Sequence, residues 1–236
     1  MTTTLIAHCG TKKISRDELR NLPVPEATKT HKPISHHELV GSLVETLAFR
    51  HIHVVRDEYA VSADGMKMFG VLDLDYEYGD TRFGIGIRNS NDRSFRLAMT
   101  ISTRVLVCDN MAFQGDFTPV LKKHTSRLNV IELLSIAVDK MQRNFEPLKQ
   151  QINDWQMWEV TDDEAKLVIY RAVVEEKFPM KLLTAVHQHY FTPRYEAFRP
   201  RTLWSLSNAF TSAFKQLAPI HQFQMTARLG TFLEQL

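Results

Sequence analysis

Residues 82–110 read RFGIGIRNSNDRSFRLAMTISTRVLVCDN, and the pattern of this stretch decides the fold. Apolar side chains alternate with small or charged ones on both sides of a short polar segment, which is typical of two half-buried β-strands. The polar segment, Asn89–Ser94, is rich in residues whose short side chains hydrogen-bond nearby backbone and tolerate unusual dihedral angles. The stretch therefore predicts an antiparallel hairpin with one apolar face and one face of glycine, hydroxyl and arginine side chains.

Two more strands are predicted directly before this hairpin. Residues 51–80 contain two alternating segments separated by Ala63-Asp64-Gly65, which has the composition of a tight turn. Residues 51–108 therefore predict an antiparallel meander of four consecutive strands with short turns. In the strand before the hairpin, three carboxylates share the face opposite the apolar residues: Asp73, Asp75 and Glu77.

Helical signals flank the meander on both sides. Ser35 and Glu38 have the spacing of a capping box, and apolar residues follow at helical spacing to about Phe49. Pro147 predicts a break or kink in the first later helix, and Pro219 separates the last helix from the one before it. Four later helices are predicted to begin near Asn129, Thr161, Lys181 and Leu203.

The predicted fold class is α+β: an N-terminal helix and a four-stranded antiparallel meander, followed by a helical C-terminal half packed on the sheet. Residues 1–34 contain three prolines and no sustained period, which predicts an extended arm with one short helix. The α+β core is predicted to span residues 35–127, and a helical region, residues 128–236, to form one compact unit with it. The arm and the exposed edges of a four-stranded sheet favour a homo-oligomer.

The composition of the 236 residues is that of an ordinary globular protein, with 44% hydrophobic and 24% charged residues. The two cysteines, Cys9 and Cys108, are too few for a disulfide framework, which favours a reducing compartment. No apolar run has the length of a secretion signal or of a membrane span. We therefore expect a cytoplasmic protein with no membrane partner, and the sequence predicts no cofactor and no metal.

Charge is distributed unevenly along the chain. Residues 56–80 contain two basic and seven acidic residues, whereas residues 82–127 contain eight basic and three acidic ones. The eight basic residues are the candidates for contact with nucleic-acid phosphates: Arg82, Arg88, Arg93, Arg96, Arg104, Lys122, Lys123 and Arg127. The sequence leaves an alternative open, in which the arginines of the hairpin pair across the sheet with Asp73, Asp75 and Glu77.

Several stretches, taken jointly, resemble one family. They are DGMKMFGVLDL (64–74), IGIRNSNDRSFRLAMTISTRVLVCDNMAFQGD (85–116), KKHT (122–125) and TLWSLSNAFT (202–211). They resemble the prokaryotic and phage- or plasmid-associated domain-of-unknown-function family 932. The resemblance implies a mobile-element context and no established activity, and the family commonly has glycine where this chain has Arg93. The positions that match the family signatures are Asn89, Ser90, Asp92, Ser94, Cys108, Asn110, His124, Thr125, Trp204 and Asn208.

Different classes of function fit these features. The basic hairpin, the mobile-element context and a layout that broadly resembles Redβ-type annealing proteins favour binding or annealing of single-stranded nucleic acid. The polar face of the hairpin lacks aromatic side chains on which bases could stack, which counts against this class. One alternative is a hydrolase that uses either metal-bound Asp73, Asp75 and Glu77 or a nucleophilic Cys108 activated by His124. Another is a module that binds a host protein, and the sequence assigns no catalytic residue.

Overall fold

The structure is a computed structural model that describes residues 12–108, 110–113, 120–125, 128–217 and 219–236. The chain divides into two compact units. The first unit comprises Met1–Arg104 and Phe117–Asn144, and the second comprises Val105–Asp116 and Phe145–Leu236. The protein is a mixed α and β protein in which the helices lie mostly in the C-terminal half of the chain.

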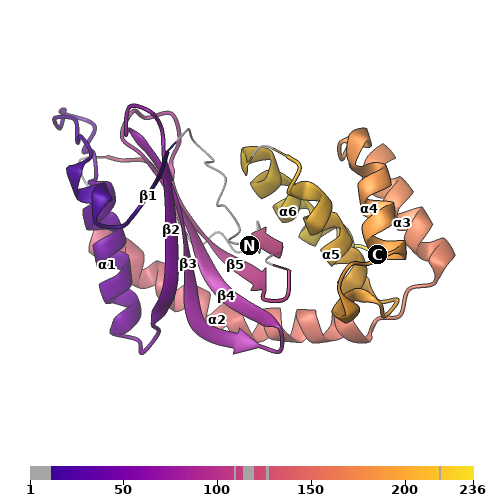
Figure 1. Ribbon diagram of the computed structural model, residues 1–236. Coiled ribbons are helices and arrows are strands. Elements are labelled where there is room, and N and C mark those ends of the chain that lie inside the picture. The colour runs from indigo at the N-terminus through magenta and orange to yellow at the C-terminus, as the bar shows by residue number, and fades with distance from the viewer. Residues whose placement is uncertain (1–11, 109, 114–119, 126–127, 218) are drawn as a thin grey trace. The chain divides into compact units, whose positions relative to one another are not determined.

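The first unit contains a curved antiparallel sheet (Figure 1). Strand β3 pairs with β2 on one side and with β4 on the other, and Gly65 adopts a φ of +70° in the predicted turn before β3. Gly70 of β3 lies opposite Tyr59, where a Cβ atom would approach the tyrosine ring to 2.7 Å. The four strands of the predicted meander are β2 (Val54–Val61), β3 (Lys67–Tyr78), β4 (Thr81–Ser90) and β5 (Leu97–Val105).

The prediction of four strands is wrong, because two more strands pair in the sheet of this unit. Strand β1 (Lys12–Ile14) pairs with β2, and strand β7 (Val120–Lys122) pairs with β5, so the described residues of the unit contribute six strands. Strand β1 lies within the segment predicted as an extended arm, and it is followed by a short 3-10 helix, Glu18–Asn21. Three residues are too few to show an alternating pattern, so neither strand could be predicted from its own residues.

Helix α1 (His36–Ala48) begins where the sequence predicts it. The hydroxyl of Ser35 accepts a hydrogen bond from the backbone N–H of Glu38 at 3.4 Å, which caps the helix. The apolar face of α1 is buried, and directly after it Arg50 donates to Asp139 at 2.6 Å and to the Ser135 hydroxyl at 2.7 Å. These bonds attach the end of α1 to the beginning of helix α2.

Helix α2 (Val130–Met157) runs without interruption through Pro147, so the predicted break is wrong. The helix begins where the sequence predicts it. The Asn129 side-chain oxygen accepts a hydrogen bond from the Glu132 backbone N–H, and the Asn129 amide donates to the Glu132 carboxylate. A proline within a helix removes one backbone hydrogen bond, but the apolar residues on both sides of Pro147 are buried and stabilise the helix. These neighbours are Phe145 and Leu148, which are 4% and 1% exposed.

The second unit is largely helical. Thr161 and Glu164 form the predicted capping box of α3, and Thr202 caps α5. The core of the unit contains Phe178, whose ring meets three other phenylalanine rings edge to face. None of the described helices combines the length and apolar character needed to cross a bilayer. The elements are β6 (Asn110–Phe113), α3 (Asp162–Val174), η3 (Met180–Leu182), α4 (Leu183–Phe191), η4 (Glu196–Phe198), α5 (Leu203–Phe214) and α6 (Pro219–Leu233).

Candidate nucleic-acid interface

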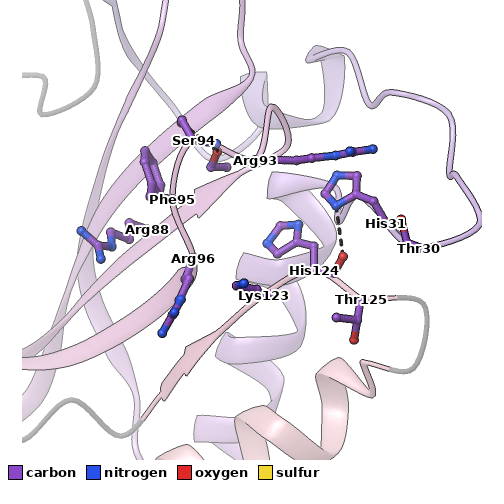
Figure 2. A pocket seen from close by; sticks show the side chains of 11 residues that line it. Thr30, His31, Arg88, Arg93, Ser94, Phe95, Arg96, Lys123, His124 and Thr125 are labelled. Atoms are coloured by element: carbon purple, nitrogen blue, oxygen red, sulfur yellow. Dashed lines mark hydrogen bonds between the residues drawn. The ribbon is translucent and has the colours of Figure 1, made fainter.

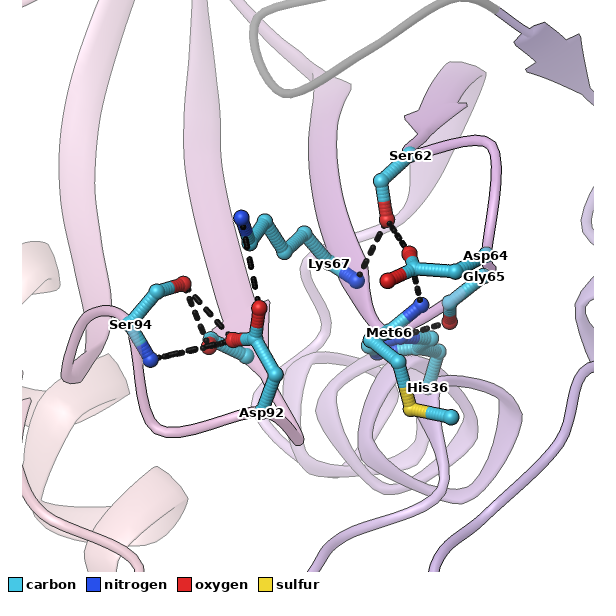
Figure 3. Close-up of polar contacts among 9 residues, drawn as sticks. His36, Ser62, Asp64, Gly65, Met66, Lys67, Asp92 and Ser94 are labelled. Carbon is cyan, nitrogen blue, oxygen red and sulfur yellow. Dashed lines mark hydrogen bonds and ion pairs between the residues drawn. The ribbon is translucent and has the colours of Figure 1, made fainter.

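The loop between β4 and β5 is organised around the carboxylate of Asp92 (Figure 3). Asp92 accepts hydrogen bonds from the hydroxyls of Ser90 and Ser94 and from the backbone N–H of Ser94, and Lys67 Nζ lies 3.2 Å away. Partial burial raises the pKa of Asp92, but the hydrogen bonds from Ser90, Ser94 and Lys67 outweigh it and hold the pKa well below its usual range. The signature residues of this loop therefore build its shape.

Arg93 follows Asp92 in the left-handed region of the backbone, with a φ of +67°. Glycine adopts this conformation at little cost, whereas a residue with a Cβ atom is strained there. This strain explains why a glycine suits the position in the family pattern. In this chain the same position carries a guanidinium on an exposed loop, with Arg93 Nη2 lying 3.4 Å from the hydroxyl of Thr28.

A buried network holds the base of this loop. The Asn89 amide donates to the Ile34 carbonyl and to His36 Nδ1, both at 2.9 Å, and His36 Nε2 donates to the Gly65 carbonyl at 3.1 Å. Burial lowers the pKa of His36 to about 4, and the hydrogen bond to Gly65 only partly offsets this effect. The neutral ring therefore accepts from Asn89 and donates to Gly65, which ties the end of β4 to α1.

A cavity of about 660 Å³ lies beside this loop (Figure 2). Three separate segments line it: the loop before β5, residues 30–31, and residues 123–125 after β7. None of the described residues that line it is acidic. We call it the basic cavity, because its lining includes Arg88, Arg93, Arg96, Lys123, His31 and His124. The neutral part of the lining is Thr30, Ser90, Ser94, Phe95 and Thr125.

Two imidazole rings stack in the basic cavity. The rings of His31 and His124 are 5.6 Å apart between centroids and inclined by 7°. His31 Nδ1 lies 3.0 Å from the carbonyl oxygen of His124, and His31 Nε2 lies 3.3 Å from that of Asn91. Either neutral tautomer of His31 donates to one of these two carbonyls. His124, in contrast, is buried and has no hydrogen-bond partner for either ring nitrogen among the described residues.

The arginines of the hairpin divide into two groups. Arg104 is 4% exposed and donates to Asp73 Oδ1 at 3.2 Å, and Arg82 Nε donates to Glu77 at 2.7 Å. These two arginines pair across the sheet, as the sequence alternative proposed. In contrast, no carboxylate of the described residues pairs with Arg88 or Arg96, and both line the basic cavity.

Phe95 supplies an aromatic surface that the sequence pattern did not predict. The alternation placed Phe95 on the apolar face of a strand, but β5 begins at Leu97 and Phe95 lies in the loop, partly exposed. The Arg88 guanidinium carbon lies 5.4 Å from the centre of its ring, and Figure 2 shows the two side chains together at one side of the cavity. Burial lowers the pKa of Arg88, which nevertheless stays charged.

Four of the predicted signature residues lie in the second unit, and three of them, Cys108, Asn110 and Asn208, line a smaller cavity of about 160 Å³. The Asn110 amide donates to the carbonyl of Asn208 at 3.1 Å, to its side-chain oxygen at 3.2 Å, and to Ser212 at 2.9 Å. Lys215 donates to the carbonyl of Cys108 at 2.7 Å. Trp204 is partly buried and packs on the apolar core of this unit. We call this the Asn110 cavity.

The carboxylates of one hydrolase alternative have partners of their own, and Cys108 and His124 of the other belong to different units. The three carboxylates have separate partners, since Asp75 accepts from the His53 backbone at 2.9 Å while Asp73 and Glu77 bind different arginines. Within the described ranges, no three His, Cys, Asp or Glu side chains lie close enough to share a metal ion. Cys108 lines the Asn110 cavity in one unit, whereas His124 lines the basic cavity in the other.

The remaining candidates are placed as follows. Lys122 is exposed in β7, Thr125 is exposed at the rim of the basic cavity, and Arg127 lies outside the described residues. His31 and Phe95 line the cavity although the sequence did not single them out. His31 shows no local signal, because its partner His124 is 93 residues away in the chain.

Comparisons of the chain with protein-family models, with curated proteins and with solved structures find no match. Its function is therefore argued from its own residues.

Proposed function

We propose that this protein binds single-stranded nucleic acid in the basic cavity of its first unit. The observation that carries the proposal is the lining of that cavity, which includes Arg88, Arg93, Arg96 and Lys123 and no acidic side chain among its described residues. Guanidinium and ammonium groups bind phosphate oxygens through charge-assisted hydrogen bonds. A concave site of this charge attracts a polyanion before it makes any specific contact.

Phe95 supports a single strand in preference to a duplex. Bases of single strands stack on exposed aromatic rings, and this contact works for any base because each has a π-face. The ring of Phe95 lies at the cavity beside Arg88, so a base and its phosphate can be bound by adjacent groups. The stacked pairs of a duplex do not offer a free base face to such a ring. The mobile-element context stays a prediction from the family resemblance.

The test is a salt titration of binding to fluorescent single- and double-stranded DNA and RNA of equal length. For a single strand, the logarithm of the binding constant falls with the logarithm of salt concentration by about 0.7 per phosphate contact. We expect the double variant Arg88→Ala/Arg96→Ala to lower this slope by roughly 1.4 and to weaken binding at low salt.

Arg82→Ala is the control, because it removes an arginine charge from the same hairpin but outside the cavity, where Glu77 pairs with it; the single variants Arg88→Ala and Arg96→Ala match it in charge. The control should bind like the unchanged protein. Absence of binding at low salt, or an equal loss in the Arg82→Ala variant, would contradict the proposal.

A further inference from the structure

His124 is the part of the basic cavity that contact with a phosphate backbone leaves unexplained. The residue is 6% exposed, and neither ring nitrogen has a hydrogen-bond partner among the described residues. Leaving a buried polar atom without a partner costs about 1–3 kcal/mol, so such atoms usually have one. The ring is nevertheless part of the cavity lining, beside His31 (Figure 2). A ligand atom that enters the cavity can therefore complete its hydrogen bonding.

The groups around His124 select an anion. His31 stacks on the ring, and Lys123, Arg93 and Arg96 line the same cavity. A metal cation would be repelled by these neighbours, whereas an anion is attracted by all of them. Burial is the main cause that lowers the pKa of His124 to about 4, and the adjacent His31 and His36 act in the same direction. The ring is therefore neutral near pH 7 and still has one N–H to donate.

The number of positive groups favours a phosphate with two negative charges. An internal phosphodiester carries one charge, whereas a phosphomonoester carries about −1.5 to −2 at pH 7 and offers three strong acceptor oxygens. Four arginine and lysine side chains line a single cavity. Its volume of about 660 Å³ falls within the usual range of small-ligand sites, which suits one nucleotide unit better than a long stretch of strand.

We propose that the His124 end of the basic cavity binds the terminal phosphomonoester of a nucleotide unit, with the His124 N–H donating to a phosphate oxygen. This inference rests on the proposed function and names the part of the strand that enters the cavity, which is a phosphorylated end. Arg93 and Lys123 bind the remaining oxygens, and Phe95 stacks on the base that carries the phosphate. A free nucleotide carries the same chemical group, so the experiment separates the two sources.

The experiment measures the affinity of one single-stranded oligonucleotide in three forms: 5′-phosphorylated, 3′-phosphorylated, and with hydroxyl groups at both ends. A nucleoside monophosphate is the fourth ligand. We expect one phosphorylated form to bind about tenfold more tightly than the hydroxyl form, because a hydrogen bond to a charged group contributes about 1.5–3 kcal/mol. A monophosphate that binds as tightly as that form would support the same site and assign it to free nucleotides.

Variants separate this role of His124 from a structural one. His124→Ala should abolish the preference for a phosphorylated end while the hydroxyl form keeps its affinity, and His124→Asn, which retains a donor, should restore part of the preference. His53→Ala is the matched control, because His53 is exposed and does not line the cavity. In the unchanged protein, the imidazole ¹⁵N signals of His124 should shift with the phosphorylated form alone, which tests the contact even if His124→Ala does not fold.

Different results would overturn the terminal-phosphate site and the proposed single-strand binding. Equal affinity for the phosphorylated and hydroxyl forms would overturn the terminal-phosphate site and leave the proposed function standing. Absence of binding for every oligonucleotide would overturn the proposed function, and binding of the monophosphate in that case would still support the phosphomonoester site.

Discussion

The basic cavity of the first unit and the Asn110 cavity of the second unit are both lined largely by polar side chains, yet their polar atoms differ in how they are paired. Around Asn110, amide, hydroxyl and ammonium groups bond to one another or to backbone carbonyls. In the basic cavity, both ring nitrogens of His124 and the Nε of Arg88 have no partner among the described residues. The paired groups stabilise the fold, and the unpaired groups are available to a ligand.

The hairpin arginines show the same distinction within one unit. Arg104 and Arg82 have carboxylate partners, whereas Arg88 has an aromatic ring beside it and no carboxylate among the described residues. Sequence position does not separate these residues, because they all lie on two adjacent strands. The partner, and not the residue type, therefore distinguishes a structural arginine from a candidate binding one.

The largest expected effect is a loss of stability, which tests whether the paired groups around Asn110 stabilise the fold. Asn110→Ala removes an amide that is 2% exposed and that hydrogen-bonds to Asn208 and to the Ser212 hydroxyl, and it leaves both residues without this partner. We expect the free energy of unfolding, measured by urea denaturation, to fall by about 3 kcal/mol. Single-strand affinity of the folded variant should stay within a factor of about two. Ser212→Ala, which loses fewer hydrogen bonds, is the control and should lower the free energy of unfolding by less. A folded Asn110→Ala protein that has lost its affinity for single strands would contradict the structural role of this cavity.

A change in pH is expected to have an intermediate effect on the free energy of unfolding. The pKa of His124 is lowered to about 4, chiefly by burial, whereas an exposed histidine in the unfolded chain titrates near 6.5. The unfolded state therefore binds more protons between these values, and stability is lost as the pH falls from about 6.5 to 4. At pH 5 the loss for this one residue is about 2 kcal/mol.

His124→Gln should remove that part of the pH dependence, as measured by urea denaturation at pH 7 and pH 5. His53→Gln should leave it unchanged, because His53 is exposed. An unfolding free energy of the His124→Gln variant that falls between pH 7 and pH 5 by as much as that of the unchanged protein would show that the ring is not buried and neutral.

The smallest expected change in stability comes from Arg93, where two substitutions separate the backbone conformation of the loop from the charge of the side chain. Arg93→Gly places glycine at a φ of +67°, which relieves strain of about 1 kcal/mol but raises the entropy of the unfolded chain. The net expectation is a free energy of unfolding higher by about 0.5 kcal/mol, together with weaker oligonucleotide binding. Arg93→Lys keeps the charge and should retain more affinity than Arg93→Gly. Equal affinities of the two variants would show that Arg93 does not contact the ligand.

Much of the secondary structure could be predicted because its causes lie within a few residues. The caps at Ser35, Thr161 and Asn129 and the turn at Gly65 depend on groups three or four positions apart, and the helices and strands begin close to them. Pro147 misled the prediction, because the burial of its neighbours in α2 outweighs a local rule. The short strands β1, β6 and β7 were not predicted, because a strand of three or four residues is defined by its partner.

The candidate site could be predicted only in part. The sequence identified Arg88, Arg93, Arg96 and Lys123 as basic and His124 as a signature residue, since residue type and local pattern carry this information. It could not show that Arg104 is paired with Asp73, that Phe95 leaves the strand, or that His31 stacks on His124. The sequence by itself thus determined where helices, turns and charges occur. Only the tertiary structure decided which charges are neutralised and which groups share a cavity, because pairing, burial and stacking depend on distances between residues far apart in the chain.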